Sequence, residues 1–388
     1  MKMKGFKKVK AVIDGKLEEN VTIAFDNKKI LYVGRDENAV TEEIPVGKNS
    51  VVLPGFIDEH THGAVGYDFT DGTEAAVKGV SSALLKEGTT TCLATLSAMP
   101  EDGTLAALRA IKRVKEKNDE CAATDSARIA GVNLEGPFLS EKFKGGHSEK
   151  NLRLPDYALF ERYCEACGNI VRAVTVAPEL EGAEEFVKKA AARGSVCFAG
   201  HTDATYGEIE RSAGYGVRAV THVYNAQRGF AGREPGTVGA ALYIDDLFCE
   251  LICDCFHVSA PAVKLLFKNK PKNKIILITD AVRVKGANLA EAESAGLKIY
   301  MTDGHPRLAD GTIAGSVLKM NEAIKNAVER CGADFAEAIT FATSNPADNL
   351  GLTDRGRIKE GLIPDFCILG EGYEVEKTLL GGRVVYEG

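Results

Sequence analysis

The sequence predicts an α/β protein made of a (β/α)8 TIM-type barrel and a second, small β domain built from both termini. Two observations predict the barrel: about eight short apolar runs follow one another from residue 51, and helical patterns separate most of them. A third observation predicts the β domain, because strand patterns occur both before residue 51 and after residue 345. We therefore assign residues 54–344 to the barrel, and residues 1–53 plus 345–388 to the β domain.

The candidate barrel strands are short, and several are apolar throughout, as expected for parallel strands that are buried on both faces. They are residues 51–57, 90–96, 129–134, 171–176, 196–199, 219–223, 248–253 and 275–279. The amphipathic stretches that alternate with them are residues 74–86, 104–117, 183–193, 260–267, 317–331 and 334–343. Eight strand–helix repeats favour a closed barrel over a doubly wound sheet.

The predicted β domain joins the two ends of the chain. Strand patterns at residues 9–13, 21–25 and 30–34 are separated by turn residues and form a meander pattern. The tail has strand patterns at residues 356–358, 365–369, 375–380 and 383–386. We infer that the tail pairs with the N-terminal strands in one sheet beside the barrel.

The amino-acid composition of the chain argues against several classes of binding partner. The 388 residues are 45% hydrophobic and 27% charged, which is ordinary for a soluble globular protein. A net charge of -7 argues against nucleic acid or an anionic membrane surface as a partner. No apolar run follows the basic N-terminus, and none is long enough to span a bilayer, so we expect a cytoplasmic protein without a membrane partner.

The ten cysteines are expected to be reduced thiols, many of them in the core. Cys164 and Cys167 form a CxxC motif on a helical pattern, where packing residues are the better interpretation. Cys249, Cys253 and Cys255 lie in an apolar run, and we expect them to be buried strand residues.

Residues 54–63 (Pro-Gly-Phe-Ile-Asp-Glu-His-Thr-His-Gly) form the first candidate metal site, where a strand runs into a tight loop. In extended backbone, side chains two positions apart point to the same side. His60 and His62 can therefore aim two imidazoles at one divalent ion. A lone His-x-His also occurs by chance in loops without a ligand role, so the interpretation depends on finding further ligands.

Further ligand-type residues stand at the ends of other candidate strands. Glu135, His201 and Asp280 follow the third, fifth and eighth strands, and His222 lies in the sixth. Each alone has an ordinary interpretation, such as a surface carboxylate or a helix N-cap. Because the carboxyl ends of barrel strands meet at one rim, a metal-dependent hydrolase site explains all four together.

The chemistry of this set follows from its donor atoms. Glu135, His201 and His222 leave a position open for water, whose pKa a divalent metal lowers towards about 7. Asp280 is placed to accept the proton of that water and to pass it to a leaving group. The fourth strand carries no lysine that could bridge two ions. Glu135 is then the expected bridge to a second ion at the His60–His62 pair. The mixed nitrogen and oxygen set suits zinc or iron.

Nine stretches in chain order carry a resemblance to a known family. They are residues 54–63, 134–138, 144–147, 199–205, 221–226, 232–236, 257–258, 279–281 and 314–316. The most specific are Glu-Gly-Pro-Phe from Glu135, His-x-x-Asn-Ala from His222, and Gly-Arg-Glu-Pro-Gly from Gly232. In this set the chain resembles the N-acetylglucosamine-6-phosphate deacetylases of the amidohydrolase superfamily.

The resemblance implies a homodimer that hydrolyses the acetamido group of an N-acetylamino sugar phosphate in amino-sugar catabolism. It implies one or two divalent ions per subunit. Glu135, His201 and His222 would hold the principal ion, and His60, His62 and Asp280 would contact the second. Asp280 would be the acid/base, and His147 would polarise the acetyl carbonyl.

The resemblance also implies a set of substrate contacts. Asn225, Ala226 and Arg233 would hold the phosphate, with Arg233 acting in its own or the neighbouring subunit. The sugar would be contacted by Gly146, His257, Ala314, Gly315 and Ser316. His305 matches no catalytic position, and we expect it in a surface turn.

The chain departs from the family pattern near the expected sugar pocket. Cys255 stands where glycine is usual, Gln227 where methionine is common, and Gly146 where alanine or threonine is expected. N-acetylgalactosamine 6-phosphate therefore stays open as the substrate. A D-aminoacylase-like amidohydrolase is a further alternative, but it needs no phosphate clamp such as Arg233. An inactive amidohydrolase-like scaffold would predict lost ligands, whereas this chain keeps them all.

Overall fold

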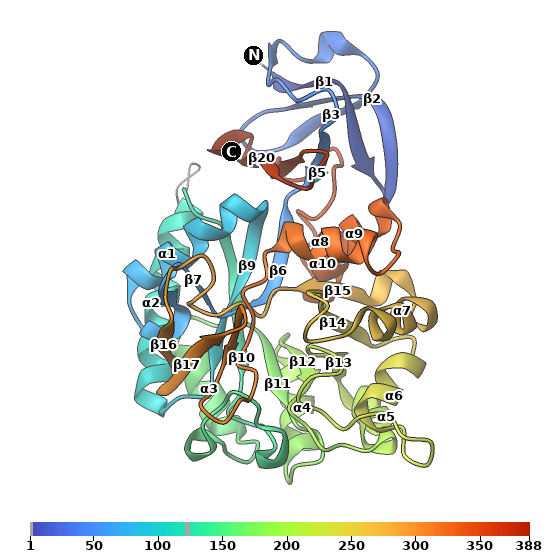
Figure 1. Cartoon of the computed structure of the whole chain (residues 1–388). Helices are drawn as coiled ribbons and strands as arrows, with labels where there is room; N and C mark the ends of the chain where they lie inside the picture. The colour runs from blue at the N-terminus through green and yellow to red at the C-terminus, as the bar shows by residue number, and fades with distance from the viewer. Residues whose placement is uncertain (1–2, 121–124) are drawn as a thin grey trace.

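A ring of eight parallel strands forms the centre of the molecule (Figure 1). The structure is a computed structural model, and it describes residues 3–120 and 125–388. The strands pair in the order β15-β14-β13-β12-β11-β10-β9-β6. Their bounds are β6 Phe56–Thr61, β9 Thr89–Ser97, β10 Arg128–Glu135, β11 Val171–Val176, β12 Val196–Ala199, β13 Val217–Val220, β14 Phe248–Ile252 and β15 Ile275–Ile278. The Asp280 N–H donates to the His60 carbonyl at 2.8 Å and joins the two edge strands, so the barrel prediction is confirmed.

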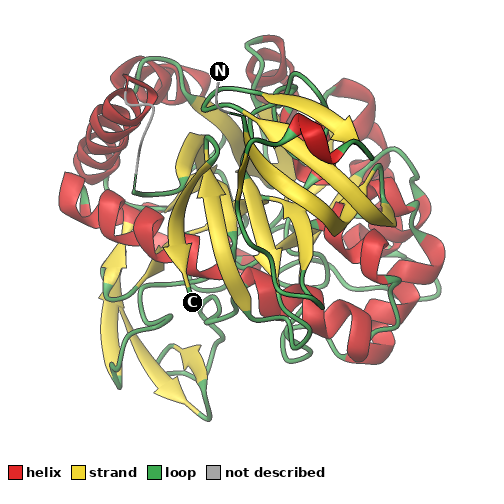
Figure 2. Cartoon of the chain, turned by 90° about the horizontal axis from the view of Figure 1, so that it is seen from above, coloured by secondary structure: helices red, strands yellow, loops and turns green. Residues whose placement is uncertain are grey.

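Helices cover the outside of this ring (Figure 2). Their bounds are α1 Glu74–Leu84, α2 Glu101–Glu120, α3 Tyr157–Ala166, α4 Ala183–Ala192, α5 Tyr206–Tyr215, α6 Gly236–Tyr243, α7 Ala260–Asn269, α8 Met320–Glu329, α9 Phe335–Phe341 and α10 Ser344–Leu350. Capping residues define where several of these helices begin. At the start of α5, the Thr205 side chain accepts from the Glu208 N–H, while the Glu208 carboxylate accepts from the Thr205 N–H. None of the helices in the described residues combines the length and apolar character needed to cross a membrane.

The second sheet contains strands from both ends of the chain (Figure 1). Its order is β21-β20-β19-β5-β1-β2-β3, with β4 beside β1, so the tail pairs with the N-terminal strands as predicted. The bounds are β1 Lys4–Ile13, β2 Lys16–Phe25, β3 Ile30–Gly34, β4 Glu42–Glu43, β5 Val51–Pro54, β19 Phe366–Leu369, β20 Val375–Leu380 and β21 Arg383–Glu387. Its core includes three aromatic rings with centroids 5.1 to 5.4 Å apart, those of Phe6, Phe25 and Phe366.

The chain passes between the two sheets at Gly55, which corrects the single strand expected at residues 51–57. The Gly55 N–H donates to the Asp365 carbonyl of the terminal sheet, and the Phe56 N–H donates to the Gly88 carbonyl of the barrel. A Cβ at position 55 would lie 2.1 Å from the Thr90 hydroxyl oxygen, so only glycine fits this crossing.

Two further expectations are corrected, and two small β elements were not predicted. Residues 356–358 form bends and no strand, with Gly356 at a φ of 81°. A small sheet that the sequence analysis missed, β16 Glu291–Ser294, β17 Leu297–Thr302 and β18 His305–Arg307, lies beside the barrel. His305 belongs to β18 and stacks on Phe256 with ring centroids 3.4 Å apart, so it is not in a surface turn. A hairpin of β7 Gly63–Ala64 and β8 Tyr67–Asp68 follows the first barrel strand.

The domain division at residues 53/54 and 344/345 stays a prediction. Residues 1 and 2 lie outside the described residues, as does Cys121. The nine described cysteines are free; Cys164 on α3 and Cys167 directly after its last residue are both buried, as expected for packing residues. Cys255 differs from the expectation, because it lies beyond the end of β14 and is partly exposed.

Candidate active site

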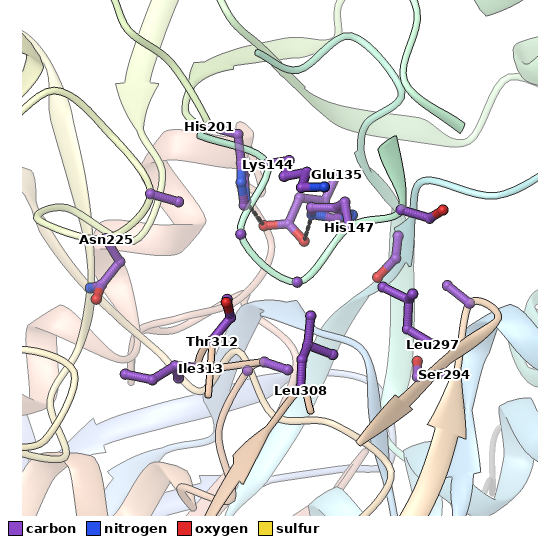
Figure 3. Close-up of a pocket in the computed structure, with 18 of the residues that line it drawn as sticks. Glu135, Lys144, His147, His201, Asn225, Ser294, Leu297, Leu308, Thr312 and Ile313 are labelled. Carbon is purple, nitrogen blue, oxygen red and sulfur yellow. Dashed lines mark hydrogen bonds and ion pairs between the residues drawn. The ribbon is translucent and has the colours of Figure 1, made fainter. Parts of the chain in front are cut away.

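The predicted site residues surround a cavity of about 1060 Å³ at the ends of the barrel strands (Figure 3). Twelve of the fifteen line it: His62, Glu135, Gly146, His147, His201, His222, Asn225, Ala226, His257, Asp280, Ala314 and Gly315. His60 is fully buried just below the cavity. Arg233 and Ser316 are the two that do not reach it within one chain.

Glu135, the last residue of β10, is the centre of the site and is 4% exposed. Its Oε1 lies 3.1 Å from His201 Nε2, 3.0 Å from His222 Nε2 and 3.3 Å from His60 Nε2. Its Oε2 lies 3.1 Å from His62 Nε2 and 3.2 Å from His147 Nε2. One carboxylate therefore faces two groups of imidazoles, as a bridging ligand does.

The hydrogen bonds of the His201–His222 pair indicate a cation between their inner nitrogens. His201 Nδ1–H donates to the Phe143 carbonyl at 2.9 Å, and His222 Nδ1–H donates to the Asn225 carbonyl at 3.2 Å. These bonds leave the two Nε2 atoms as acceptors, yet they lie 3.1 Å apart and face Glu135 Oε1. Three acceptors at such distances repel one another unless positive charge lies among them. A divalent ion fits this donor set.

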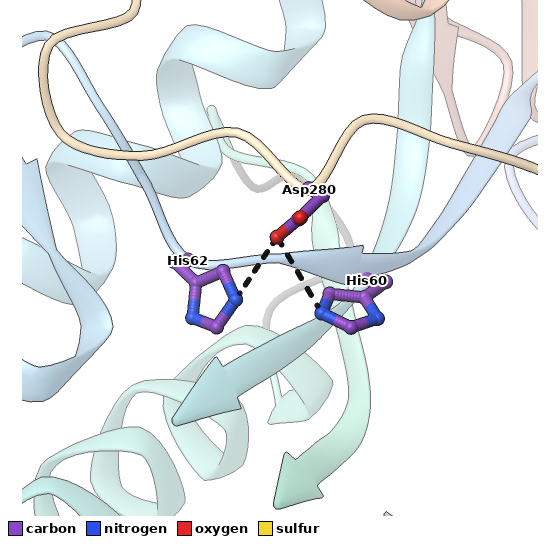
Figure 4. Close-up of side chains that lie close together, drawn as sticks. All are labelled: His60, His62 and Asp280. Carbon is purple, nitrogen blue, oxygen red and sulfur yellow. Dashed lines mark ion pairs between the residues drawn. The ribbon is translucent and has the colours of Figure 1, made fainter. Parts of the chain in front are cut away.

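The His60–His62 pair forms a second cluster with Asp280 (Figure 4). Asp280 Oδ1 lies 3.2 Å from His62 Nε2 and 3.6 Å from His60 Nε2. The two imidazoles point to one side of β6, as the alternation of an extended chain requires. The other group of possible ligands is Glu135, His147 and His201, and the two groups together fit a divalent metal site.

The pKa shifts of His60 and His62 also indicate that positive charge is favourable between the carboxylates of the site. Burial lowers the pKa of His62, but hydrogen bonds with Asp280 and Glu135 outweigh it and raise the value to about 9. Burial also opposes protonation of His60, yet the charges of Glu135 and Glu250 raise its pKa well above the usual range. Burial lowers the pKa of His201 to about 4. Protons on the His60–His62 pair and bound cations are alternative sources of charge between these carboxylates.

Below the cavity, the sequence analysis missed a layer of buried carboxylates. Glu250 on β14 is fully buried, and its Oε2 lies 3.2 Å from His60 Nδ1 and accepts from the Thr221 hydroxyl. Glu59 accepts from Asn349 Nδ2 at 2.8 Å, and burial with the nearby Glu250 charge raises its pKa well above normal. A glutamate inside the apolar run Phe-Cys-Glu-Leu-Ile was the available signal for Glu250.

His147 and His257 present defined ring nitrogens to the cavity. His147 Nδ1 accepts from the Ala98 N–H at 3.4 Å, so its Nε2 carries the proton that faces Glu135. His257 Nδ1–H donates to Asp254 Oδ2 at 2.6 Å, and its buried Nε2 has no hydrogen-bond partner among the described residues. Asp254 therefore orients His257, a role that the sequence analysis did not assign.

Three ligand-type residues have left-handed backbone. The φ angles of His201, His222 and Asp280 are 46°, 25° and 47°. Each residue comes two positions after its strand ends, so His222 follows β13 and does not lie within it. Non-glycine residues in this region cost roughly 1–3 kcal/mol each and are concentrated at functional sites. The bend at each strand end turns the side chain inward over the barrel.

One part of the turn at residues 314–316 lines the cavity, and the other part supports the cavity wall from behind. Gly315 has a φ of 70°, and a Cβ there would lie 2.4 Å from a Val282 methyl group. Ser316 is buried, and its hydroxyl donates to the Thr279 carbonyl at 2.5 Å. Its N–H donates to the Asp280 carbonyl at 2.8 Å. Ser316 thus holds the Asp280 turn from behind, whereas the sequence analysis expected it to contact the sugar.

Positive charge at the cavity comes from residues that the sequence analysis did not single out. Lys142, Lys144 and Lys150 line the cavity, and Lys142 Nζ also lies 2.7 Å from Asp203 Oδ2. Arg233 is exposed in the loop before α6 and is not in the wall. Asn225 and Ala226, in contrast, do line the cavity.

Comparison with known proteins identifies the family of this site. The amidohydrolase family profile matches residues 51–385. The chain belongs to the amidohydrolase family. Membership and the two ligand clusters confirm the prediction of a metal-dependent hydrolase of carbon–nitrogen bonds.

Relatives within the family confirm the resemblance seen in the sequence. An N-acetylglucosamine-6-phosphate deacetylase of Bacillus subtilis is 33% identical over 98% of this chain and 96% of its own length. An N-acetylgalactosamine-6-phosphate deacetylase of Escherichia coli O157:H7 is 30% identical over 89% of this chain and 92% of its own. The crystal structure of the N-acetylglucosamine-6-phosphate deacetylase from Thermotoga maritima has a TM-score of 0.88 and 33% identity, covering 99% of this chain and 100% of that one.

Proposed function

We propose that this amidohydrolase hydrolyses N-acetyl-D-glucosamine 6-phosphate to D-glucosamine 6-phosphate and acetate, a step of amino-sugar catabolism. The observation that carries the proposal is the position of Asp280. Its Oδ1 lies 3.2 Å from His62 Nε2, in the wall of a cavity that Glu135 and His147 also line. A base beside a metal-ligand cluster and a hydrogen-bond donor suits the hydrolysis of an amide.

The metal ligands in this proposal are the two clusters that share Glu135. Glu135, His201 and His222 would hold the principal divalent ion, zinc or iron, and His60 and His62 would hold a second. When bound, the ion lowers the pKa of water towards about 7 and so makes hydroxide available at neutral pH. The Nδ1 hydrogen bonds of His201 and His222 to backbone carbonyls keep their Nε2 lone pairs directed inward.

Asp280 and His147 carry the proton transfers and the charge stabilisation. Burial raises the pKa of Asp280, but the hydrogen bond with His62 and the charges of His60 and His62 outweigh burial and hold the pKa below its ordinary value. A bound cation in place of the protons on this histidine pair would equally keep Asp280 a carboxylate at the start of the reaction. It accepts the proton of the attacking water and then donates it to the nitrogen of the leaving amine. The Nε2–H of His147 donates to the acetyl oxygen, where negative charge develops.

The remaining predicted residues hold the sugar phosphate. His257, Gly146, Ala314 and Gly315 face the sugar, with Ser316 supporting their turn. Asn225 and Ala226 bind the phosphate from the same chain. Because Arg233 does not reach its own cavity, we assign it to the phosphate in the cavity of a neighbouring subunit, in a cytoplasmic homodimer.

A comparison of three substrates tests the proposal. Acetate release by the metal-loaded protein is measured with N-acetylglucosamine 6-phosphate, the unphosphorylated sugar and N-acetylgalactosamine 6-phosphate. Loss of charge-assisted phosphate contacts should lower kcat/KM for the unphosphorylated sugar by about 10- to 100-fold. Equal kcat/KM values with and without phosphate would contradict the assigned phosphate site.

The galactosamine isomer is a second candidate substrate. It is favoured by the departures at Gly146, Gln227 and Cys255 and by the Escherichia coli relative. Gln227 is buried, and its Nε2 donates to the His222 carbonyl at 3.2 Å, beside the metal ligands. A higher kcat/KM for the galactosamine isomer than for the glucosamine isomer would replace the first candidate.

A further inference from the structure

Three cysteines that no step of the proposed mechanism uses converge beside the His257 wall of the cavity. Cys253 and Cys255 follow β14, and Cys331 follows α8. Cys255 Sγ lies 3.7 Å from Cys331 Sγ, although the two residues are 76 positions apart in the chain. The interaction with Cys331, together with burial, raises the pKa of Cys253 well above its ordinary value. Cys253 and Cys331 are buried, whereas Cys255 is partly exposed.

The end of α8 holds the segment that carries two of these cysteines. Asn326 Nδ2 donates to the Cys253 carbonyl at 3.0 Å, and Arg330 Nη1 donates to the Asp254 carbonyl at 3.4 Å. Cys331 follows directly in the chain. The contact between Cys255 and Cys331 is therefore part of an anchored junction between α8 and the loop after β14.

The backbone at Cys255 adds a second observation. Its φ is 59°, in the left-handed region that favours glycine. In this chain a thiol occupies the strained position and points at another thiol. Such a departure from local preference indicates a selected role for the side chain.

The surroundings make Cys331 the more reactive member of the pair. Hydrogen bonds with Cys253 and Cys255, helped by the charges of Lys264 and Arg330, lower its pKa to about 7 despite burial. Burial instead raises the pKa of Cys164 to about 12. Thiolates are the nucleophiles of cysteine chemistry, so Cys331 can react at neutral pH.

We propose that Cys255 and Cys331 are a modification site, at which a hydroperoxide closes a reversible disulfide. The Cys331 thiolate attacks the peroxide oxygen, forming a sulfenic acid and releasing hydroxide. The Cys255 sulfur then attacks the Cys331 sulfur, and the S–S bond forms as the sulfenic oxygen leaves as water. Two thiols are oxidised and one peroxide is reduced, and a dithiol reductant restores both thiols.

The disulfide has a consequence for the cavity that rests on the proposed function. Closing the bond shortens the distance between the sulfur atoms from 3.7 Å to about 2.05 Å. Cys255 follows Asp254 directly, and Asp254 Oδ2 accepts from His257 at 2.6 Å. Movement of this segment displaces His257, and we expect kcat/KM to fall about tenfold or more. Because His257 is assigned to the sugar, most of this fall should be a rise in KM.

The experiment treats the zinc-loaded protein with hydrogen peroxide, alkylates the remaining thiols and maps the peptides without reduction. A Cys255–Cys331 cross-linked peptide that dithiothreitol removes is the expected result. Cys255→Gly should lose the cross-link. Cys167→Ser, which alters a buried thiol at the C-terminal end of α3, should still form it. Separately alkylated or over-oxidised Cys255 and Cys331, or a cross-link between Cys253 and Cys331, would overturn the assignment.

A second readout separates this proposal from the proposed function. The cross-link is detected by mass without any substrate, so it tests the modification even if N-acetylglucosamine 6-phosphate is not turned over. Where turnover is present, peroxide should raise KM in the native protein and leave Cys255→Gly unaffected. Equal peroxide inactivation of both proteins would overturn the link to His257.

Discussion

The two histidine pairs that face Glu135 are held in different ways. His201 and His222 donate their Nδ1–H groups to backbone carbonyls. The His60–His62 pair instead depends on side chains: His60 Nδ1 lies against a buried glutamate, and His62 Nδ1 lies against a serine hydroxyl. Substituting the side chains around His201 and His222 leaves their backbone acceptors in place. The hydrogen bonding of the His60–His62 pair, in contrast, can be changed by substituting a single neighbouring side chain.

This difference assigns the two pairs different roles. The His201–His222 pair provides a fixed site, because its orientation follows from the main chain and from left-handed backbone at both residues. In the proposed function, the His60–His62 pair would decide whether a second ion is held beside Glu135. Substitutions should therefore remove all metal, remove one ion or weaken one ion, according to the atoms that they change.

Glu135→Gln should have the largest effect. The Glu135 carboxylate contacts both histidine pairs. The uncharged amide of glutamine would not neutralise the positive charge of either ion. We expect metal affinity at both positions to fall by more than about 100-fold and turnover to fall to background. Metal analysis after dialysis, with circular dichroism as a check on folding, measures this. Retention of two ions would remove Glu135 from the bridging position.

His60→Gln should remove one ion and leave the other. The His201–His222 pair and Glu135 are unchanged, so the principal ion stays bound. Turnover should fall about 10- to 100-fold, because the charge of the second ion is lost from the site. His222→Asn is the matched variant and should lose the principal ion. An unchanged metal content in His60→Gln would contradict the two-ion account.

Glu250→Gln should weaken the second ion without removing a ligand. The charge that accepts the His60 Nδ1–H is replaced by an amide of the same shape, and such changes cost about 10- to 100-fold in metal affinity. Titration of metal-free protein with zinc separates the two affinities. The first should stay unchanged and the second should fall. Equal weakening of both would indicate a general structural defect.

Ser97→Ala should have the smallest effect. The Ser97 hydroxyl lies 3.2 Å from His62 Nδ1 and is neutral and partly exposed. Loss of one neutral hydrogen bond costs about 0.5–1.5 kcal/mol, which is about a two- to tenfold loss of affinity for the second ion. The same zinc titration checks it. A loss larger than that of Glu250→Gln would reverse the order expected from charge and burial.

The positions of the ligands could be predicted because parallel barrel strands end at one rim. Glu135, His201 and Asp280 each follow an apolar run, so the strand pattern alone brings them together. The substrate loops were less predictable. Ser316 lies two residues from Ala314, yet only the fold shows that one lines the cavity and the other supports Asp280.

Two other features could not be predicted for physical reasons. The strands β16 to β18 have little burial, and although Leu297, Ile299 and Met301 alternate with more polar residues in β17, its neighbours β16 and β18 have only four and three residues and are too short to show a period of two. The carboxylates of Glu59 and Glu250 are buried, and burial without an evident partner contradicts what sequence patterns assume about charged residues. Their partners, Asn349 on α10 for Glu59 and His60 on β6 for Glu250, are distant in the sequence and become visible only in the fold.

The most direct test of the account compares acetate release from N-acetylglucosamine 6-phosphate by the native protein and by Asp280→Asn at equal metal content. The amide keeps the shape of the side chain but cannot accept and return the proton. The account predicts acetate and free amine in equal amounts from the native protein, and a rate about 10³-fold lower in the variant. Equal rates would remove Asp280 from the mechanism, and no acetate from the native protein would refute the proposed reaction.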